Sequence, residues 1–302
     1  MKMIVLSCEH RSRLNLSIYL QTFMRILIGI LTVSLLVSHP AHAASNIKPE
    51  TSLNFGLLPF LSTKTLVKKF EPMISYLEKT LNRPINVKSA PDFKTYIERA
   101  TQGEYDLFLA APHISAYMEK RFQSRRVSRF KRTLKGYFVV HTDSTYKSLS
   151  ELRGKRFATA DQLAVITILG EGELVDNGLD PNKDFVRHYT SHNNAMHLVA
   201  QGKQDVAVVG VTIFDNMQAP VKKRLRVLAK TKGIPHMMFH TRRGLSDSDH
   251  QAISDAMLRF TASGPGKEFF TKVAYGDMTP INNQDIERLS NLVVLLEQKL
   301  KQ

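Results

Sequence analysis

The sequence predicts an α/β fold made of two lobes that hinge around a cleft. Short apolar strands alternate with amphipathic helices from Leu53 onward, which is the pattern of α/β proteins. The alternation restarts at Gly136, and no low-complexity linker separates the two halves, so we expect two α/β units joined by strands. The chain has 302 residues, 43% of them hydrophobic, which is enough to bury a core in one or two domains.

The first half contains clear boundary residues. Asp92 is the expected N-cap of a helix that Gly103 ends, and Pro112 stands in the first turn of the next helix. The near-continuous apolar run 105–110 suits a strand buried on both faces of a parallel sheet. We therefore expect strands at 53–58, 85–87 and 105–110, and helices at 64–82, 92–102 and from 112 onward.

The second half continues the same alternation to the C-terminus. Apolar runs bounded by polar turns indicate the strands, and Gly178 marks the end of a long helix. The predicted strands are 136–141, 156–160, 185–189, 206–211, 226–229 and 237–241. The predicted helices are 148–152, 164–177, 193–201, 247–261, 266–273 and 280–300.

The N-terminal segment has the features of a cleaved signal peptide. Arg25 supplies a cation, residues 26–37 form a short apolar stretch, and Ala41-His42-Ala43 provides a small-x-small cleavage site. The apolar stretch is shorter than the roughly 20 residues that span a bilayer, so we expect cleavage after residue 43 rather than a membrane anchor. Residues 1–43 are excluded from the fold, and a start at Met24 instead of Met1 stays open.

Cleavage would leave a basic chain without cysteine. It removes Cys8, the only cysteine, so the mature protein needs no disulfide, which fits an oxidising periplasm. The formal net charge falls from +15 to +12, because four cations and one acid are lost. A protein this basic favours anionic partners.

The loops that follow strands are the expected ligand-binding elements. In open α/β sheets, ligands bind outside the carboxyl ends of the strands. The segments in that position are 58–64, 110–115, 159–164 and 190–194.

A series of short motifs runs in order from Leu53 to Ile286, nearly the whole mature chain. They are Leu53-Asn54-Phe55-Gly56, Phe70-Glu71-Pro72, Ala90-Pro91-Asp92-Phe93, Gly103-Glu104-Tyr105-Asp106, Gly136-Tyr137, Leu149-Ser150-Glu151-Leu152-Arg153-Gly154-Lys155, Ser191-His192-Asn193-Asn194, and Gly202-Lys203 with Asp205-Val206. In order and spacing they resemble the phosphonate-binding family of periplasmic solute receptors of ABC transporters.

The resemblance implies a type II periplasmic-binding fold with a hinged cleft between the lobes. Lobe 1 would comprise residues 44–138 and 236–302, and lobe 2 residues 139–235. The resemblance further implies a non-enzymatic periplasmic receptor, monomeric and without a cofactor. Such a receptor would capture a phosphonate- or phosphate-like oxyanion and deliver it to the inner-membrane permease of an ABC importer.

The resemblance also assigns residues that would face the ligand. Three positions match the family's aromatic and histidine positions: Phe93, Tyr137 and His192. A tyrosine hydroxyl and an imidazole N–H can donate hydrogen bonds to an oxyanion, and the helix starts near Ala164 and Asn193 offer backbone N–H groups. His113, just inside its predicted helix, is a further candidate.

The sequence departs from the family pattern at one helix start. The family carries a Ser-Thr-Ser-type anion clamp there, where this chain has Ala164-Val165-Ile166. Losing two or three hydrogen bonds to a charged group, at about 1.5–3 kcal/mol each, weakens phosphonate binding by orders of magnitude. The acidic positions that hold an amine-bearing ligand are also absent near 210–212 and His236. An aminoalkyl phosphonate is therefore disfavoured, and ligand identity stays open.

Each candidate residue also has a purely structural interpretation. Tyr137 and Phe93 could be packing residues of a strand and of the core, and His192 could cap a helix. The seven cations between Arg121 and Lys135 are interpreted as a solvated strand face, with a docking surface for acidic groups of a partner as the alternative.

Other function classes lack their sequence patterns. His240 lies in a predicted strand and His236 directly before it, and no three or four convergent ligands indicate a metal site. No nucleophile elbow, P-loop or dinucleotide-binding motif indicates an enzyme. Nucleic-acid binding is suggested by charge alone, and export argues against it. The alternative that stays open is a sensory receptor for a non-phosphonate, anionic or organic solute, which would signal to a membrane sensor protein.

Overall fold

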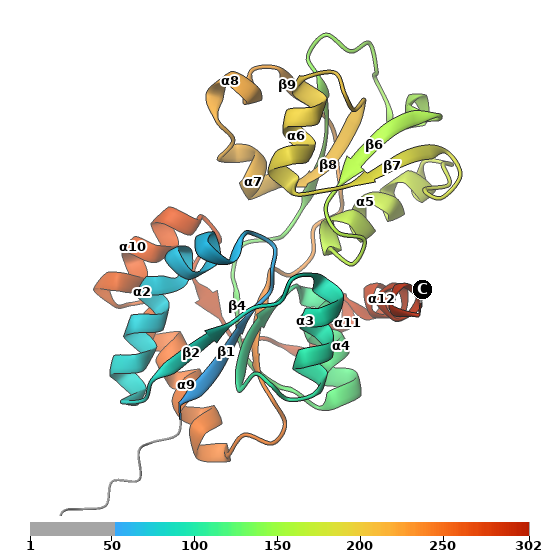
Figure 1. The fold of residues 1–302 in the computed structure, drawn as a ribbon. Coiled ribbons are helices and arrows are strands. Elements are labelled where there is room, and N and C mark those ends of the chain that lie inside the picture. Colours follow the sequence, from blue (N-terminus) through green and yellow to red (C-terminus); the bar gives the residue numbers. More distant parts are fainter. Residues whose placement is uncertain (1–51, 302) are drawn as a thin grey trace, which may run out of the picture. The chain divides into compact units, whose positions relative to one another are not determined.

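Two β-sheets organise residues 52–301, the part of the chain described by the computed structural model (Figure 1). The six-stranded sheet has the order β11-β4-β10-β3-β1-β2 and the five-stranded sheet the order β7-β6-β8-β5-β9. The first sheet contains β1 (Leu53–Leu57), β2 (Ile85–Lys88), β3 (Leu107–Ala110), β4 (Arg125–Phe130), β10 (Met238–Thr241) and β11 (Met278–Thr279). The second contains β5 (Gly136–His141), β6 (Lys155–Thr159), β7 (Phe185–Tyr189), β8 (Val206–Gly210) and β9 (Leu225–Lys230).

The chain passes twice between the sheets, first from β4 to β5 and then from β9 to β10. The two crossing segments meet at one isolated antiparallel bridge, in which the backbone N–H groups of Leu134 and Ile234 each donate to the other residue's carbonyl, at 2.9 and 3.0 Å. We call the elements around the first sheet lobe 1 and those around the second lobe 2. The predicted boundary at residue 138 falls inside β5, which pairs along its whole length with β8 and β9, so residues 136–138 belong with the second sheet.

Both sheets mix parallel and antiparallel pairs. In lobe 1, β1 runs parallel to β2 and β3, and β10 runs antiparallel to β3. In lobe 2, β6 runs parallel to β7 and β8, and β5 runs antiparallel to β8. This arrangement places the ends of the parallel strands beside the start of the helices that follow them.

Helices surround the sheets of both lobes. Those of lobe 1 are α2 (Thr63–Leu81), α3 (Phe93–Thr101), α4 (Pro112–Phe122), α9 (Asp247–Phe260), α10 (Gly264–Val273), α11 (Asn283–Glu287) and α12 (Ser290–Leu300). Those of lobe 2 are the 3₁₀ helix η1 (Leu149–Leu152), α5 (Val165–Asp176), α6 (His192–Ala200), α7 (Val211–Asp215) and α8 (Ala219–Lys222).

The predicted boundary residues of the helices are confirmed. Asp92 caps α3, because its side chain accepts a hydrogen bond from the Thr95 backbone N–H at 2.7 Å. Gly103 and Gly178 follow α3 and α5 with φ near +77° and +74°, a left-handed conformation that glycine adopts without steric cost.

Three features differ from the prediction. The expected single helix 280–300 is two helices, because Asn282 opens α11 with a capping box and the chain turns again before α12. The short elements α7, α8 and β11 were not predicted, since segments of two to five residues carry too little periodicity. The charged stretch after α4 contains β4, an interior strand whose Val127, Ser128 and Phe130 are buried.

The hydrophobic core continues from one lobe into the other. One cluster packs α2, α9 and α10 of lobe 1 against the first sheet. A second cluster joins Phe108 and Ile114 of lobe 1 to Leu163, Ile166 and Val208 of lobe 2. In residues 52–301, no helix is both long and apolar enough to span a membrane. The predicted signal segment 1–43 lies outside the described residues.

Candidate functional site

A cavity of about 370 Å³ lies between the lobes and beside the crossing segments. Lobe 1 contributes residues such as Phe60, Phe93 and Tyr275, and lobe 2 contributes Tyr137 and His192. The crossing segments add residues 132–135 and 236–237. Both lobes therefore face whatever occupies this space.

Most of the sequence-predicted site residues line this cavity. They are Phe93, Tyr137, Ala164, Val165, Ile166 and His192. Asn193 lines a neighbouring pocket instead, to which Phe93 and His192 also contribute. The loops after strands explain part of this gathering, because those after β2, β6 and β7 lead to Phe93, Ala164 and His192.

His113 does not line the cavity. Its side chain is fully buried in α4, and its Nε2 lies 2.9 Å from the backbone carbonyl of Leu163 in lobe 2. Burial lowers the pKa of His113 to about 4, against a smaller upward effect of that carbonyl. The neutral imidazole can therefore donate its Nε2–H to Leu163 and join the two lobes.

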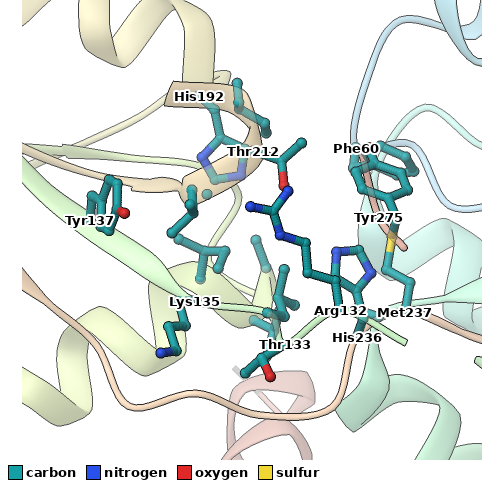
Figure 2. Close-up of a pocket in the computed structure, with 18 of the residues that line it drawn as sticks. Phe60, Arg132, Thr133, Lys135, Tyr137, His192, Thr212, His236, Met237 and Tyr275 are labelled. Atoms are coloured by element: carbon teal, nitrogen blue, oxygen red, sulfur yellow. The ribbon is translucent and has the colours of Figure 1, made fainter. Parts of the chain in front are cut away.

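His192 stands at the start of α6 and points into the cavity (Figure 2). Ser191 is the N-cap and His192 the first residue of the helix, since the Ser191 hydroxyl accepts from the Asn194 backbone N–H at 3.2 Å. The His192 side chain is 9% exposed, and its Nδ1 has no hydrogen-bond partner among the described residues. Burial lowers the pKa of His192 to about 4, and the Val208 backbone acts in the opposite direction. The neutral ring is thus available to a ligand.

The start of α5 presents backbone groups and apolar side chains to the cavity. Ala164, at the N-cap position, makes no side-chain hydrogen bond, and Val165 and Ile166 supply methyl groups. The nearest hydroxyl along the helix, that of Thr167, is fully buried and lies 2.7 Å from the hydroxyl of Thr159. Polar side chains for an anion must therefore come from other elements.

Those polar side chains are cationic. Arg132, Lys135 and Lys230 line the cavity, and none of the described lining residues is Asp or Glu. Lys230 Nζ lies 5.5 Å from the centre of the Tyr137 ring. Figure 2 shows the Arg132 side chain extending into the cavity between His192 and Thr212 on one side and Phe60 and Tyr275 on the other. The cavity has the charge required by an anion.

Sequence reasoning missed most of the residues that line the cavity. Phe60 lies in one of the predicted ligand loops, which was the available signal. Arg132 and Lys135 lie in the basic stretch that was interpreted as a solvated face, and their position just before the crossing strand β5 was the overlooked signal. Tyr275 and Met237 come from segments far along the chain, and no local pattern predicts their place.

His236 is a second buried histidine of the cavity. It is 2% exposed, and its ring centre lies 4.8 Å from that of Tyr275. Burial lowers the pKa of His236 to about 3, with the cations Arg132 and Arg129 acting in the same direction. In the part of the chain that the structure describes, no three His, Cys, Asp or Glu residues gather to hold a metal ion.

A comparison with known protein families identifies the family of a chain with this two-lobed cavity. The model of the ABC transporter phosphonate periplasmic substrate-binding proteins matches residues 55–286. The chain belongs to this family. It is a family of periplasmic substrate-binding proteins of ABC transporters, as the sequence motifs indicated.

Individual relatives agree in sequence and in fold. The chain is 25% identical to the phosphonates-binding periplasmic protein of Escherichia coli over 287 residues, covering 89% of this chain and 82% of that protein. PhnD1 of Prochlorococcus marinus, solved in complex with methylphosphonate, superposes with a TM-score of 0.73 at 15% identity, over 83% of this chain and 98% of that one.

A second solved structure has the same two-lobed fold. It is a binding-protein component of an ABC phosphonate transporter from Pseudomonas aeruginosa, with a TM-score of 0.69 at 18% identity, over 83% of this chain and 95% of that one. The predicted α/β, two-lobed periplasmic-binding fold is thereby confirmed.

Proposed function

We propose that this protein captures a small oxyanion in the periplasm and delivers it to the permease of an ABC importer. The observation that carries the proposal is a cavity lined by Arg132, Lys135 and Lys230, with no Asp or Glu among the described residues that line it. An anion gains favourable interactions there, and a cation would meet three like charges.

Phosphorus oxyanions are the first ligands to consider. Family membership supports them, as does the relative solved in complex with methylphosphonate. The apolar start of α5 replaces the hydroxyl-rich clamp of the family pattern, so the anion would be held by cations and imidazoles at other positions. The lack of a lining carboxylate disfavours ligands that carry an amine.

Binding would couple the lobes. A ligand that touches Arg132 before the crossing bridge and His192 in lobe 2 gains contacts with both lobes when they approach each other. Such differential contacts favour the closed state. Cleavage after Ala43 would release the receptor, as a monomer, to the periplasm, and N-terminal sequencing of the exported protein tests that site.

A thermal-shift screen tests the proposal. The protein recovered from the periplasm is heated with phosphate, phosphite, methylphosphonate, phenylphosphonate, sulfate or methanesulfonate. A ligand at 100 times its dissociation constant stabilises the fold by about 2.7 kcal/mol, which gives a readily measured shift. A shift with a phosphorus oxyanion supports the proposal, and the absence of any shift across the series contradicts it.

A further inference from the structure

The arginines from the last turn of α4 to the start of β5 have different electrostatic partners. Four of them form ion pairs with carboxylates: Arg121 with Glu297, Arg125 with Asp247, Arg126 with Glu119, and Arg129 with Asp285. Arg132 forms no ion pair within the described residues, and its Nη1 donates to the backbone carbonyl of Ala274 at 2.8 Å. Its guanidinium group therefore retains most of its donors and all of its charge for a ligand.

The side chain of Arg132 lies where a ligand would sit. It is exposed, and it extends into the cavity toward His192 and Thr212 (Figure 2). His192 is nine-tenths buried with an unpartnered Nδ1, and the Nδ1 of His236 is likewise buried and unpartnered. Unsatisfied buried polar atoms that face a cavity indicate a missing hydrogen-bond partner. Arg132 and the two imidazoles thus surround one space.

The remaining walls of the cavity are apolar. Phe60, Phe93, Ile166 and Met237 contribute hydrocarbon and aromatic surface. Among the described lining residues, none is an Asp or Glu that could neutralise an ammonium group. The volume of about 370 Å³ lies within the range of pockets that hold drug-sized organic molecules, roughly 300–1,000 Å³. The space exceeds what a bare inorganic anion needs.

We infer that Arg132 is the charge anchor of the ligand, and that the ligand is an oxyanion carrying an uncharged apolar group. The inference deepens the proposed function and rests on it. The guanidinium group would bind two oxygens of the phosphonate in bidentate geometry, while the apolar substituent packs on the aromatic wall. Specificity would then come from the Arg132 guanidinium and from the lack of Asp and Glu among the described lining residues, instead of from hydroxyl groups on α5.

Calorimetric titration of the exported protein tests the inference with three probes: phenylphosphonate, methylphosphonate and 2-aminoethylphosphonate. We expect the affinity to fall in that order. Arg132→Gln should weaken phenylphosphonate binding by about 10- to 100-fold, the range for a lost hydrogen-bonded charge contact. Arg132→Lys should recover part of the loss, because it keeps the charge but not the two-pronged geometry.

Lys131→Gln is the matched control. Lys131 is an exposed cation of the same segment, but it does not line the cavity, so its loss should change the affinity less than about 3-fold. Lys230→Gln removes a cation that does line the cavity and should weaken binding less than Arg132→Gln does. Unfolding curves without ligand verify that each variant folds.

Each adverse outcome has a distinct meaning. If Arg132→Gln binds phenylphosphonate within 3-fold of the wild-type affinity, the anchor is wrong while the proposed function stands. If 2-aminoethylphosphonate binds more tightly than phenylphosphonate, the ligand class is wrong. If no probe binds the wild-type protein, both the inference and the phosphorus-oxyanion proposal fail.

Discussion

Two regions where the lobes approach each other differ in how their polar groups are used. Beside α4 and α12, groups of lobe 1 bind directly to groups of lobe 2. His113 contacts the Leu163 carbonyl at 2.9 Å, and Lys299 of α12 pairs with Glu171 of α5 at 2.9 Å. At the cavity, Arg132 and His192 face the same space without binding each other.

The first region stabilises the folded protein, and the second is available to bind a ligand. Direct contacts between lobes contribute to the folded state whether or not a ligand is present. Groups left without partners contribute little to folding, and they gain their interactions when a ligand arrives. Substitutions in the first region should therefore act on unfolding, and substitutions in the second on affinity.

Acid should have the largest effect on stability. Burial lowers the pKa values of four histidines, to about 4 for two and about 3 for two: His113, His192, His236 and His240. Below the unfolded-state pKa of about 6.5, the unfolded chain binds more protons, so the free energy of unfolding falls as pH drops from about 6.5 to about 4. Each histidine contributes up to about 1.4 kcal/mol per pH unit in that window.

Urea unfolding at pH 7, 6 and 5 measures this slope. The His113→Ala variant should lose the contribution of one histidine and become less sensitive to acid than the wild-type protein. Equal unfolding free energies at pH 7 and pH 5 would contradict the buried, neutral state of these residues.

His113→Ala and His192→Ala are the next test, because the two histidines have similar pKa values and different surroundings. His113→Ala should destabilise the protein by about 3 kcal/mol at pH 7, since it empties a fully buried site and leaves the Leu163 carbonyl unpaired. His192→Ala should cost about 1 kcal/mol or less, because its side chain borders an existing cavity.

Oxyanion affinity should show the reverse order. Loss of His192 should weaken the binding of any phosphonate that the wild-type protein accepts, and loss of His113 should leave it nearly unchanged in the folded protein. A larger stability loss for His192→Ala than for His113→Ala would overturn the distinction between the two regions.

Glu171→Gln should destabilise the protein less than His113→Ala does. Glu171 is 12% exposed on the side chain and pairs with Lys299 at 2.9 Å and with Arg187 at 3.2 Å. Removing its charge leaves two partly buried cations without an anion, which we expect to cost about 2 kcal/mol in chemical unfolding at low salt. Lys272→Gln, which breaks the exposed pair with Glu268, is the control and should leave the free energy of unfolding nearly unchanged. Equal decreases in the free energy of unfolding for Glu171→Gln and Lys272→Gln would contradict a stabilising role of the α5–α12 contact.

The fold could be predicted because its local patterns are strong. Residues such as Asp92, Ser191 and Gly178 act within a few positions of their place in the sequence, so their roles as caps and stops follow from the chain alone. The division of 280–300 into two helices was missed, since the Asn282 capping box lies inside a continuous helical pattern.

The site was only partly predictable, because tertiary pairing decides which polar groups are free. In the sequence, Arg132 looks like its neighbours Arg126 and Arg129. The structure places Glu119 and Asp285 beside those neighbours, whereas no carboxylate of residues 52–301 forms an ion pair with Arg132. His113 showed the opposite error, since its place after a strand suggested the cleft and the fold buried it against Leu163.

The bridge between Leu134 and Ile234 marks the border between the two lobes in both crossing segments. Arg132 precedes Leu134 by two residues and His236 follows Ile234 by two, so both lie on the lobe 1 side of the bridge in the antiparallel register. His192 belongs to lobe 2. A rotation of the lobes about this bridge would carry Arg132 and His236 together, and would change their separation from His192. The opening of the cleft can therefore be followed by one distance, that from Arg132 to His192. A pair of spectroscopic labels flanking these positions would report this distance in solution.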